Sequence, residues 1–332
     1  MKNIKGNIFG GVTAAVIALP LALAFGVASG AGAVAGVYGA IVLGFFASLF
    51  GGTPTQISGP TGPMTVVVAS AVVIFSGDMN AVMAVILLTG FFQIIFGITK
   101  VGKYVKYIPY PVISGFMSGI GLIIIILQVN PFFGLAGYGS VLESLYNLPN
   151  TFSNMNKEAL FISFSTLCIM ILTPKKISSI IPAALISLVV MTAITIFFKF
   201  DIATIGTIPT SLPEFKMPSF EVSQLKQIIT LAITLALLGS IDTLLTSLVA
   251  DSITKTKHNS NKELMAQGLG NILVSFIGGI AGAGATMRTV INIKSGGTTK
   301  LSGIIHSISL LSIVLFMAPI ATEIPLAVLA EF

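Results

Sequence analysis

The chain has 332 residues, of which 55% are hydrophobic and only 8% are charged, whereas a soluble domain carries about 25% charged residues. This composition excludes a soluble fold, and the apolar runs are long enough as helices to cross about 30 Å of hydrocarbon, so they predict an all-α integral membrane protein. The net charge of +6 comes mainly from lysines scattered between these runs, which is typical of membrane topology and not of nucleic-acid binding.

The apolar runs predict a series of membrane segments, separated by glycine, proline and charged residues. In chain order the segments cover residues 9–27, 32–50, 61–76, 80–98, 110–128, 159–173, 177–198, 225–248, 264–280, 286–296, 302–320 and 324–332. Segments 61–76 and 286–296 are too short for a full crossing. We interpret the N-terminal apolar stretch as the first span and not as a cleaved signal.

The lysines fix the orientation of these segments. With a cytoplasmic N-terminus, twelve lysines fall on the cytoplasmic side and four on the outer side, which is the bias that the positive-inside rule expects. We therefore expect a multi-pass protein of the plasma (inner) membrane. Residues 131–158 and 199–224 then form external surface excursions.

Two stretches more than 200 residues apart resemble each other. Phe46–Gly52 is followed by Gly59-Pro60-Thr61, and Leu273–Gly279 is followed by Gly284-Ala285-Thr286. In each stretch a span ends in Gly-Gly, an irregular segment follows, and a threonine opens a short apolar helix. Matching interruptions in two halves indicate the binding site of an inverted-repeat transporter.

The two predicted half-helices can bind an anion. The N–H groups at the start of a helix broken within the membrane are unpaired and carry a partial positive charge of roughly half an elementary unit. Thr61 and Thr286 suit the N-cap positions, and the glycines let the backbone approach a ligand. The alternative is that these small residues form close helix-packing surfaces.

Asp242 is the one acidic residue predicted to lie deep in a span, where a carboxylate costs about 2.5 to 3.5 kcal/mol. Thr246 lies one turn further on the same helix face. A carboxylate, hydroxyls and free carbonyls suit a small cation such as sodium. The alternatives are a carboxyl group that couples transport to protons and a structural ion pair.

Arg288 falls in the first turn of the second short helix, where it opposes the helix dipole unless an anion or a carboxylate faces it. We expect it to contact the anion, to pair with Asp242 or to snorkel outward. His258 and His306 are interpreted as solvent-facing or packing residues. The sequence contains no nucleotide-binding loop, metal cluster or nucleophile constellation, so it predicts secondary transport and neither an enzyme nor a bound cofactor.

Five ordered motifs resemble the sulfate permease family, and within it the sodium-dependent bicarbonate transporters of cyanobacteria. They begin at Gly10 (GGVTAAVIALP), Gly59 (GPTGPM), Val112 (VISGF), His258 (HNSNKEL) and Gly282 (GAGAT). Leu21-Ala22 after the first-span proline resembles the bicarbonate branch, since sulfate-carrying members have Gln-Gly there.

The resemblance implies two inverted repeats of seven segments, in which a core domain moves as an elevator against a gate domain. It divides this chain into core segments 1–4 (residues 1–108), gate segments 5–7 (109–223), core segments 8–11 (224–321) and the start of gate segment 12 (322–332). It also implies a homodimer with a cytoplasmic STAS domain. We expect the second repeat to be truncated and the STAS domain to be missing.

Carried over by motif, the resemblance also implies the ligand sets. The anion-binding residues are Thr61, Gly62, Ala285, Thr286 and Arg288. The sodium-binding residues are Asp242, Thr246, Gly284, Ala285 and Thr286. Arg288 departs from the bicarbonate branch, which is expected to have a small residue there, and its fixed charge beside Asp242 could replace sodium.

Three functions follow from the sequence. The first is sodium-coupled bicarbonate uptake. The second is transport of sulfate or another oxyanion by proton symport or exchange. The third is a truncated membrane partner that does not transport but assembles with a complete relative.

Overall fold

The computed structural model describes residues 3–107, 109–137, 141–174, 177, 183–205 and 214–331. Before the first external segment it contains α1 (Ile4–Ala28), α2 (Ala33–Phe50), β1 (Ser58–Gly59), α3 (Gly62–Ile74), α4 (Met79–Ile98), η1 (Val101–Tyr107) and α5 (Tyr110–Phe132). The middle of the chain forms α6 (Val141–Tyr146), α7 (Leu148–Ser153), α8 (Lys157–Leu172) and α10 (Ala183–Phe198). The last part forms η2 (Val222–Gln224), α11 (Leu225–Thr254), α12 (Ser260–Ser275), β2 (Ala283–Gly284), α13 (Thr286–Lys294), α14 (Lys300–Ala321) and α15 (Leu326–Leu329).

Every predicted membrane segment contains a helix, so the predicted helical class is confirmed. Four helical stretches of the described chain are long and apolar enough to cross a membrane: Ile4–Ala28, Ala33–Phe50, Met79–Ile98 and Val222–Thr254. Part of the predicted segment 177–198 lies outside the described residues. The predicted end at residue 280 is wrong, because α12 stops at Ser275 and Gly278 then adopts a positive φ of 69°.

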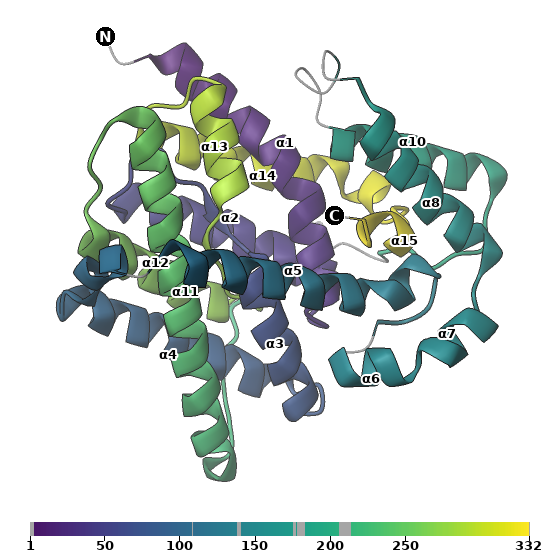
Figure 1. Ribbon diagram of the computed structural model, residues 1–332, viewed down its shortest axis with the longest axis horizontal. Helices are drawn as coiled ribbons and strands as arrows, with labels where there is room; N and C mark the ends of the chain where they lie inside the picture. Colours follow the sequence, from purple (N-terminus) through teal and green to yellow (C-terminus); the bar gives the residue numbers. More distant parts are fainter. Residues whose placement is uncertain are drawn as a thin grey trace.

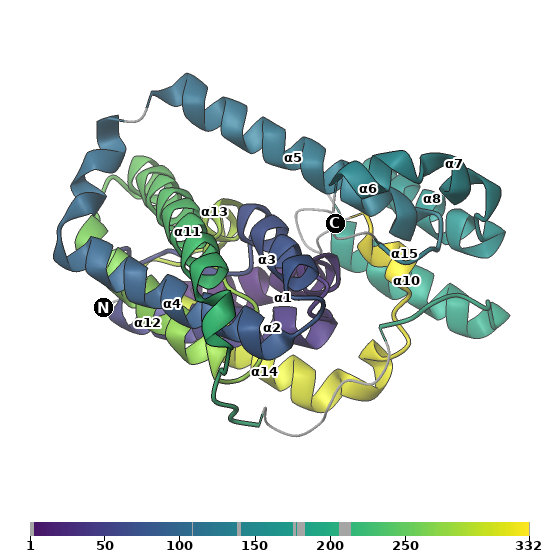
Figure 2. The same cartoon turned by 90° about the horizontal axis from the view of Figure 1, so that it is seen from below.

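The helices form two groups, which are seen most clearly from below (Figures 1 and 2). In one group, α1, α2 and α4 pack against α11, α12 and α14, although these two sets of helices are far apart in the sequence. In the other group, α8 packs against α10 and the C-terminal α15. Helix α5 extends from the first group to the second.

Two apolar clusters support this arrangement. One includes Leu43, Met64, Val85 and Leu235 and fills the space between α2, α3, α4 and α11. The other joins α1 and α2 to α8, α10, α14 and α15, so it links the two groups of helices. Burying a large aliphatic side chain contributes about 1.5–3 kcal/mol in water, although within lipid close packing has a larger share.

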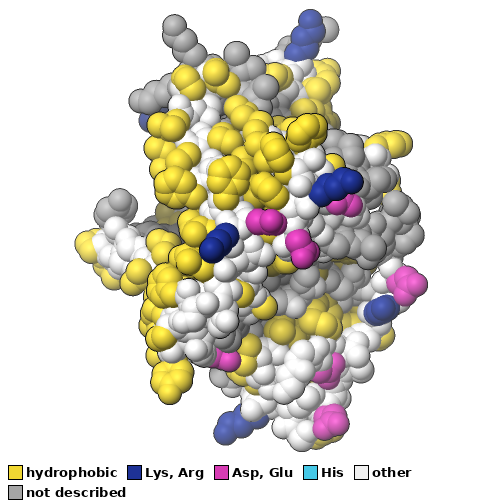
Figure 3. Space-filling view, turned by 90° about the vertical axis from the view of Figure 1, so that its right-hand side faces the viewer, with side chains coloured by type: hydrophobic (Ala, Val, Ile, Leu, Met, Phe, Trp, Pro, Cys, Tyr) yellow, Lys and Arg dark blue, Asp and Glu magenta, His cyan; other side chains and the backbone are white. Residues whose placement is uncertain are grey.

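The outer face of α8 and α10 is apolar. Figure 3 shows hydrophobic side chains gathered on this side of the molecule, with few charged groups among them. Phe161, Phe164, Phe197 and Phe198 are all more than half exposed. An apolar exposed surface of this kind is the expected surface of a protein that faces lipid.

Candidate functional site

The two predicted half-helices meet at a small antiparallel sheet. β1 pairs with β2 so that Ser58 faces Gly284 and Gly59 faces Ala283. Helix α3 begins at Gly62, just after β1, and α13 begins at Thr286, just after β2. Because the strands are antiparallel, the chain leaves the sheet in opposite directions, and the N-termini of α3 and α13 start close together on either side of it.

No side chain among the described residues caps either half-helix. Thr61 is the N-cap residue of α3, as predicted, but its side chain makes no capping hydrogen bond. The prediction that Thr286 is an N-cap is wrong, since it is already the first helical residue and Ala285 takes the cap position. The first-turn amides therefore have neither an intrahelical acceptor nor a side-chain cap, and their positive ends are available to an anion.

Helix α11 carries a row of oxygen atoms against these helix starts. The Thr246 hydroxyl donates to the Gly284 carbonyl oxygen at 2.9 Å and lies 2.7 Å from the Thr286 hydroxyl. The Gly284 N–H in turn donates to the hydroxyl of Thr243, which lies almost one turn before Thr246 on α11, at 3.0 Å. These bonds hold β2 and the start of α13 against α11.

Asp242 lies one turn before Thr246, and its side chain is buried. Its Oδ2 has no hydrogen-bond partner among the described residues, and the same is true of the Thr61 hydroxyl. Helix α11, which carries Asp242, packs against both α3 and α13. The structure therefore places a carboxylate with an unused oxygen beside both helix starts.

These hydrogen bonds bring together Thr246, Gly284 and Thr286 of the predicted sodium residues, and Asp242 lies one turn before Thr246 on α11. Asp242, Thr246, Gly284 and Thr286 supply a carboxylate, two hydroxyls and a carbonyl, which are the oxygen ligands that hard cations prefer. Ala285 is adjacent, but its N–H donates to the Ile57 carbonyl oxygen and its own carbonyl oxygen accepts from Thr289. The unpartnered carboxylate oxygen means that this set of residues fits a small cation.

Arg288 is fully buried, with 2% of its surface exposed, so the alternative in which it snorkels outward is wrong. Its Nη2 donates to the Pro60 carbonyl oxygen at 2.6 Å. The guanidinium of this α13 residue therefore lies at the start of α3. Within the part of the chain that the structure describes, its Nη1 has no acceptor, and no Arg288 nitrogen lies within 4.0 Å of an Asp242 oxygen. A charged donor is thus available between the two helix starts.

A stripe of polar residues on α12 was missed by the sequence analysis. Glu263, Gln267 and Asn271 are all buried, and the side-chain amide of Asn271 donates to the Gly282 carbonyl at 3.1 Å while its oxygen accepts from Gly282 N–H at 3.0 Å. The spacing of four residues along an apolar helix was the available signal, because such residues share one face. Glu263 directly precedes the predicted segment 264–280, so the sequence placed it at a segment end.

Neither histidine makes a hydrogen bond to a predicted ligand residue in the part of the chain that the structure describes. His258 Nδ1 lies 2.7 Å from Asp251 Oδ2, and its Nε2 lies 2.9 Å from the Ser260 hydroxyl, at the turn between α11 and α12. His306 is buried in α14, and both of its ring nitrogens are without a partner in the described ranges. These same ranges contain no group of three or more His, Cys, Asp or Glu side chains arranged to hold a metal ion.

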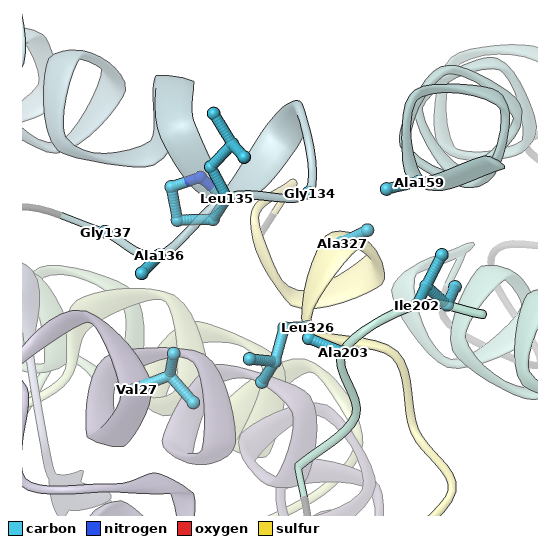
Figure 4. Close-up of a pocket in the computed structure, with 11 residues that line it drawn as sticks. Val27, Gly134, Leu135, Ala136, Gly137, Ala159, Ile202, Ala203, Leu326 and Ala327 are labelled. Atoms are coloured by element: carbon cyan, nitrogen blue, oxygen red, sulfur yellow. The ribbon is translucent and has the colours of Figure 1, made fainter. Parts of the chain in front are cut away.

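A separate apolar pocket of about 160 Å³ lies between the two groups of helices (Figure 4). Val27 of α1, Ala159 of α8 and Leu326 of α15 point into it, and the turn after α5 covers it. It contains none of the predicted ligand residues. Its lining offers no charged group to an anion, so the anion site is better placed at the sheet.

Comparisons with known proteins agree with this architecture. A model of the sulfate permease family matches residues 4–332. The bicarbonate transporter BicA of Picosynechococcus sp. is 52% identical over 342 residues, which cover 99% of this chain and 60% of that protein. The putative sulfate transporter YvdB of Bacillus subtilis is 34% identical over 302 residues, which cover 89% of this chain and 56% of that protein.

A solved structure, the transmembrane domain of a cyanobacterium bicarbonate transporter BicA, is similar in fold with a TM-score of 0.94. It is 50% identical, and the match covers 100% of this chain and 87% of that one. The chain spans between half and two thirds of the full length of the curated relatives. The predictions of a multi-pass membrane protein and of a resemblance to the sulfate permease family are confirmed by these similarities.

Proposed function

The chain belongs to the sulfate permease family, and we propose that it forms the binding core for uptake of bicarbonate together with sodium. The observation that carries this proposal is the meeting of two uncapped helix starts, those of α3 and α13, beside the unpartnered carboxylate oxygen of Asp242. The bicarbonate transporter named among its relatives supports the choice of anion.

In this proposal the anion lies between the starts of α3 and α13. The first-turn amides and Arg288 Nη1 donate to its oxygens, while sodium is held by Asp242, Thr246 and the Gly284 carbonyl. A buried carboxylate repels an anion, and a bound sodium ion cancels that repulsion. Each ligand therefore binds better in the presence of the other, which is the thermodynamic basis of coupled transport.

The two groups of helices support an elevator movement. We propose that the group formed by α1–α4 and α11–α14 carries the site, and that it moves against the group that contains α8 and α10. The site is built entirely from the first group, so it can move without being taken apart. We further propose a plasma-membrane location with a cytoplasmic N-terminus, and assembly as a homodimer.

The test is uptake of labelled bicarbonate into vesicles that contain the purified protein, with and without a sodium gradient. We expect uptake that depends on sodium, and we expect Asp242→Asn to abolish this dependence. Asp78→Asn is the matched control, because Asp78 is an exposed N-cap of α4, where asparagine serves equally well. The coupling would be refuted if the rate of bicarbonate uptake were the same with and without sodium and the same in Asp242→Asn as in the parent protein.

Arg288 favours a second candidate function. A buried guanidinium that reaches from α13 to the start of α3 would supply the positive charge that sodium would otherwise bring. The protein would then carry sulfate or another oxyanion without sodium. Its similarity to the putative sulfate transporter YvdB also supports this function. Competition between unlabelled bicarbonate and sulfate in the same vesicles, at zero and at high sodium, separates the two functions.

A further inference from the structure

Glu263 is a buried carboxylate that lies outside the proposed ligand set. It is in the first turn of α12 and is 1% exposed. Across the described parts of the chain, no Lys, Arg or His nitrogen lies within 4.0 Å of its oxygens. A buried charge without an ion pair is expensive unless several hydrogen bonds satisfy it.

Four N–H donors satisfy this carboxylate. Oε2 accepts from the backbone N–H groups of Gly52 at 2.7 Å and Thr53 at 2.8 Å. Oε1 accepts from the side-chain amides of Gln56 at 2.9 Å and Gln267 at 3.0 Å. The residue thereby ties α12 to the segment between α2 and β1.

An ionised carboxylate can only accept hydrogen bonds, so it fixes which way each glutamine amide faces. The Gln56 nitrogen must point to Glu263, and its oxygen is then left to accept from the Ser247 hydroxyl at 2.8 Å. The Gln267 nitrogen must also point to Glu263, and its second hydrogen reaches the Ser58 hydroxyl at 2.6 Å.

These two amides lie against the two strands. Gln267 binds Ser58 in β1, while the Gln56 side chain packs so closely on Gly284 in β2 that a Cβ at that position would lie 2.7 Å from Gln56 Cδ. Ser247, the partner of Gln56, directly follows Thr246 on α11, and Thr246 binds the Gly284 carbonyl. One carboxylate therefore controls contacts to both strands and to the helix that carries Asp242.

We propose that Glu263 is a positioning residue for transport: its charge orients Gln56 and Gln267, and these amides hold the β1–β2 pair at which both half-helices begin. The proposal rests on the proposed function, since it concerns the geometry of the same anion site. Glu263 itself touches neither the anion nor sodium.

Glu263→Gln tests the proposal, because glutamine keeps the shape but places an N–H₂ group where the carboxylate accepts hydrogen bonds. In vesicles that contain equal amounts of folded protein, we expect the KM for labelled bicarbonate to rise at least tenfold. Thr89→Val is the matched control, since the buried Thr89 hydroxyl bonds the Val85 carbonyl oxygen of its own helix at 2.8 Å and approaches the Ala232 carbonyl oxygen of α11 only at 3.4 Å. The control is expected to leave KM unchanged.

Hydrogen–deuterium exchange gives a second readout that does not need transport. We expect Glu263→Gln to accelerate exchange of the amides of residues 57–59 and 283–285, and Thr89→Val to leave them protected. If Glu263→Gln does not fold, Gln56→Met replaces it in the test, because this variant removes one of the four donors and leaves the other three. We expect Gln56→Met to raise the KM for bicarbonate and to accelerate exchange of the same strand amides.

The outcomes are distinct. A parent protein that moves no bicarbonate refutes the proposed function, and the exchange data then still decide the role of Glu263. A lower melting temperature and lower Vmax with unchanged KM and unchanged exchange at both strands would show that Glu263 only stabilises the fold, and would overturn the inference.

Discussion

Gly282 is the position at which one added methyl group should do most damage to the site. It directly precedes β2, and a Cβ there would lie within 3.0 Å of the Gly59 carbonyl carbon and oxygen in β1 and of Leu43 Cδ2. Gly282 has no positive φ, so alanine is acceptable to its own backbone and the whole effect is steric. Two of these three atoms belong to the Gly59 backbone, which cannot rotate away as a side chain can, so the two strands must move apart to admit the methyl group.

The cost follows from the bonds that such a movement breaks. Separation of the strands weakens the pairing of Gly59 with Ala283 and the two hydrogen bonds between Asn271 and Gly282. With a net contribution of about 1 kcal/mol for each bond, loss of two or three lowers the free energy of unfolding by about 2–3 kcal/mol. Overpacking a well-packed core has a cost of similar size, about 1–3 kcal/mol.

Gly282→Ala should therefore reduce sodium-dependent bicarbonate uptake at least tenfold per folded molecule and lower the melting temperature. Both are measured on purified protein, uptake in vesicles and melting by intrinsic tyrosine fluorescence. The matched control is Gly119→Ala in α5, where an added Cβ meets no atom of the described chain within 4 Å. Parent-like uptake by Gly282→Ala would refute the reasoning that the close approach of β1 and β2 forms the site.

Two further predictions concern the ligands. Thr246→Val keeps the shape of the side chain but removes the hydroxyl that donates to Gly284, so the sodium concentration for half-maximal uptake should rise about tenfold, the equivalent of about 1.4 kcal/mol; an unchanged sodium dependence would remove Thr246 from the cation site. Arg288→Gln loses a charged donor, so the KM for the anion should rise about tenfold to a hundredfold, whereas a KM that stays within twofold of the parent would contradict the contact. If Arg288 replaces sodium, the same variant should instead become dependent on sodium, which uptake at several sodium concentrations will show.

The sequence was sufficient to predict the apolar helices and the broken repeat. Charge, glycine and proline mark where apolar helices end, and the matching stretches before Thr61 and Thr286 correctly predicted short helices at α3 and α13. These signals are local or repeated, so they can be read without knowledge of how the chain packs.

Other features depend on contacts between distant parts of the chain. The pairing of Ser58 with Gly284 joins segments more than 200 residues apart, and it draws Thr286 into helix α13 and its hydroxyl toward Thr246. Glu263 adjoins an exposed lysine in the sequence, and only its contacts with Gly52 and Thr53 reveal a buried charge. The direction of Arg288 likewise depends on the Pro60 carbonyl across the site.

The central claim is that an anion and sodium bind side by side at the starts of α3 and α13. It is tested most directly by measuring the dissociation constant of bicarbonate for the purified protein over a range of sodium concentrations. The account predicts that saturating sodium tightens bicarbonate binding on the order of tenfold, and that bicarbonate tightens sodium binding by the same factor. A bicarbonate dissociation constant that is the same at every sodium concentration would contradict it.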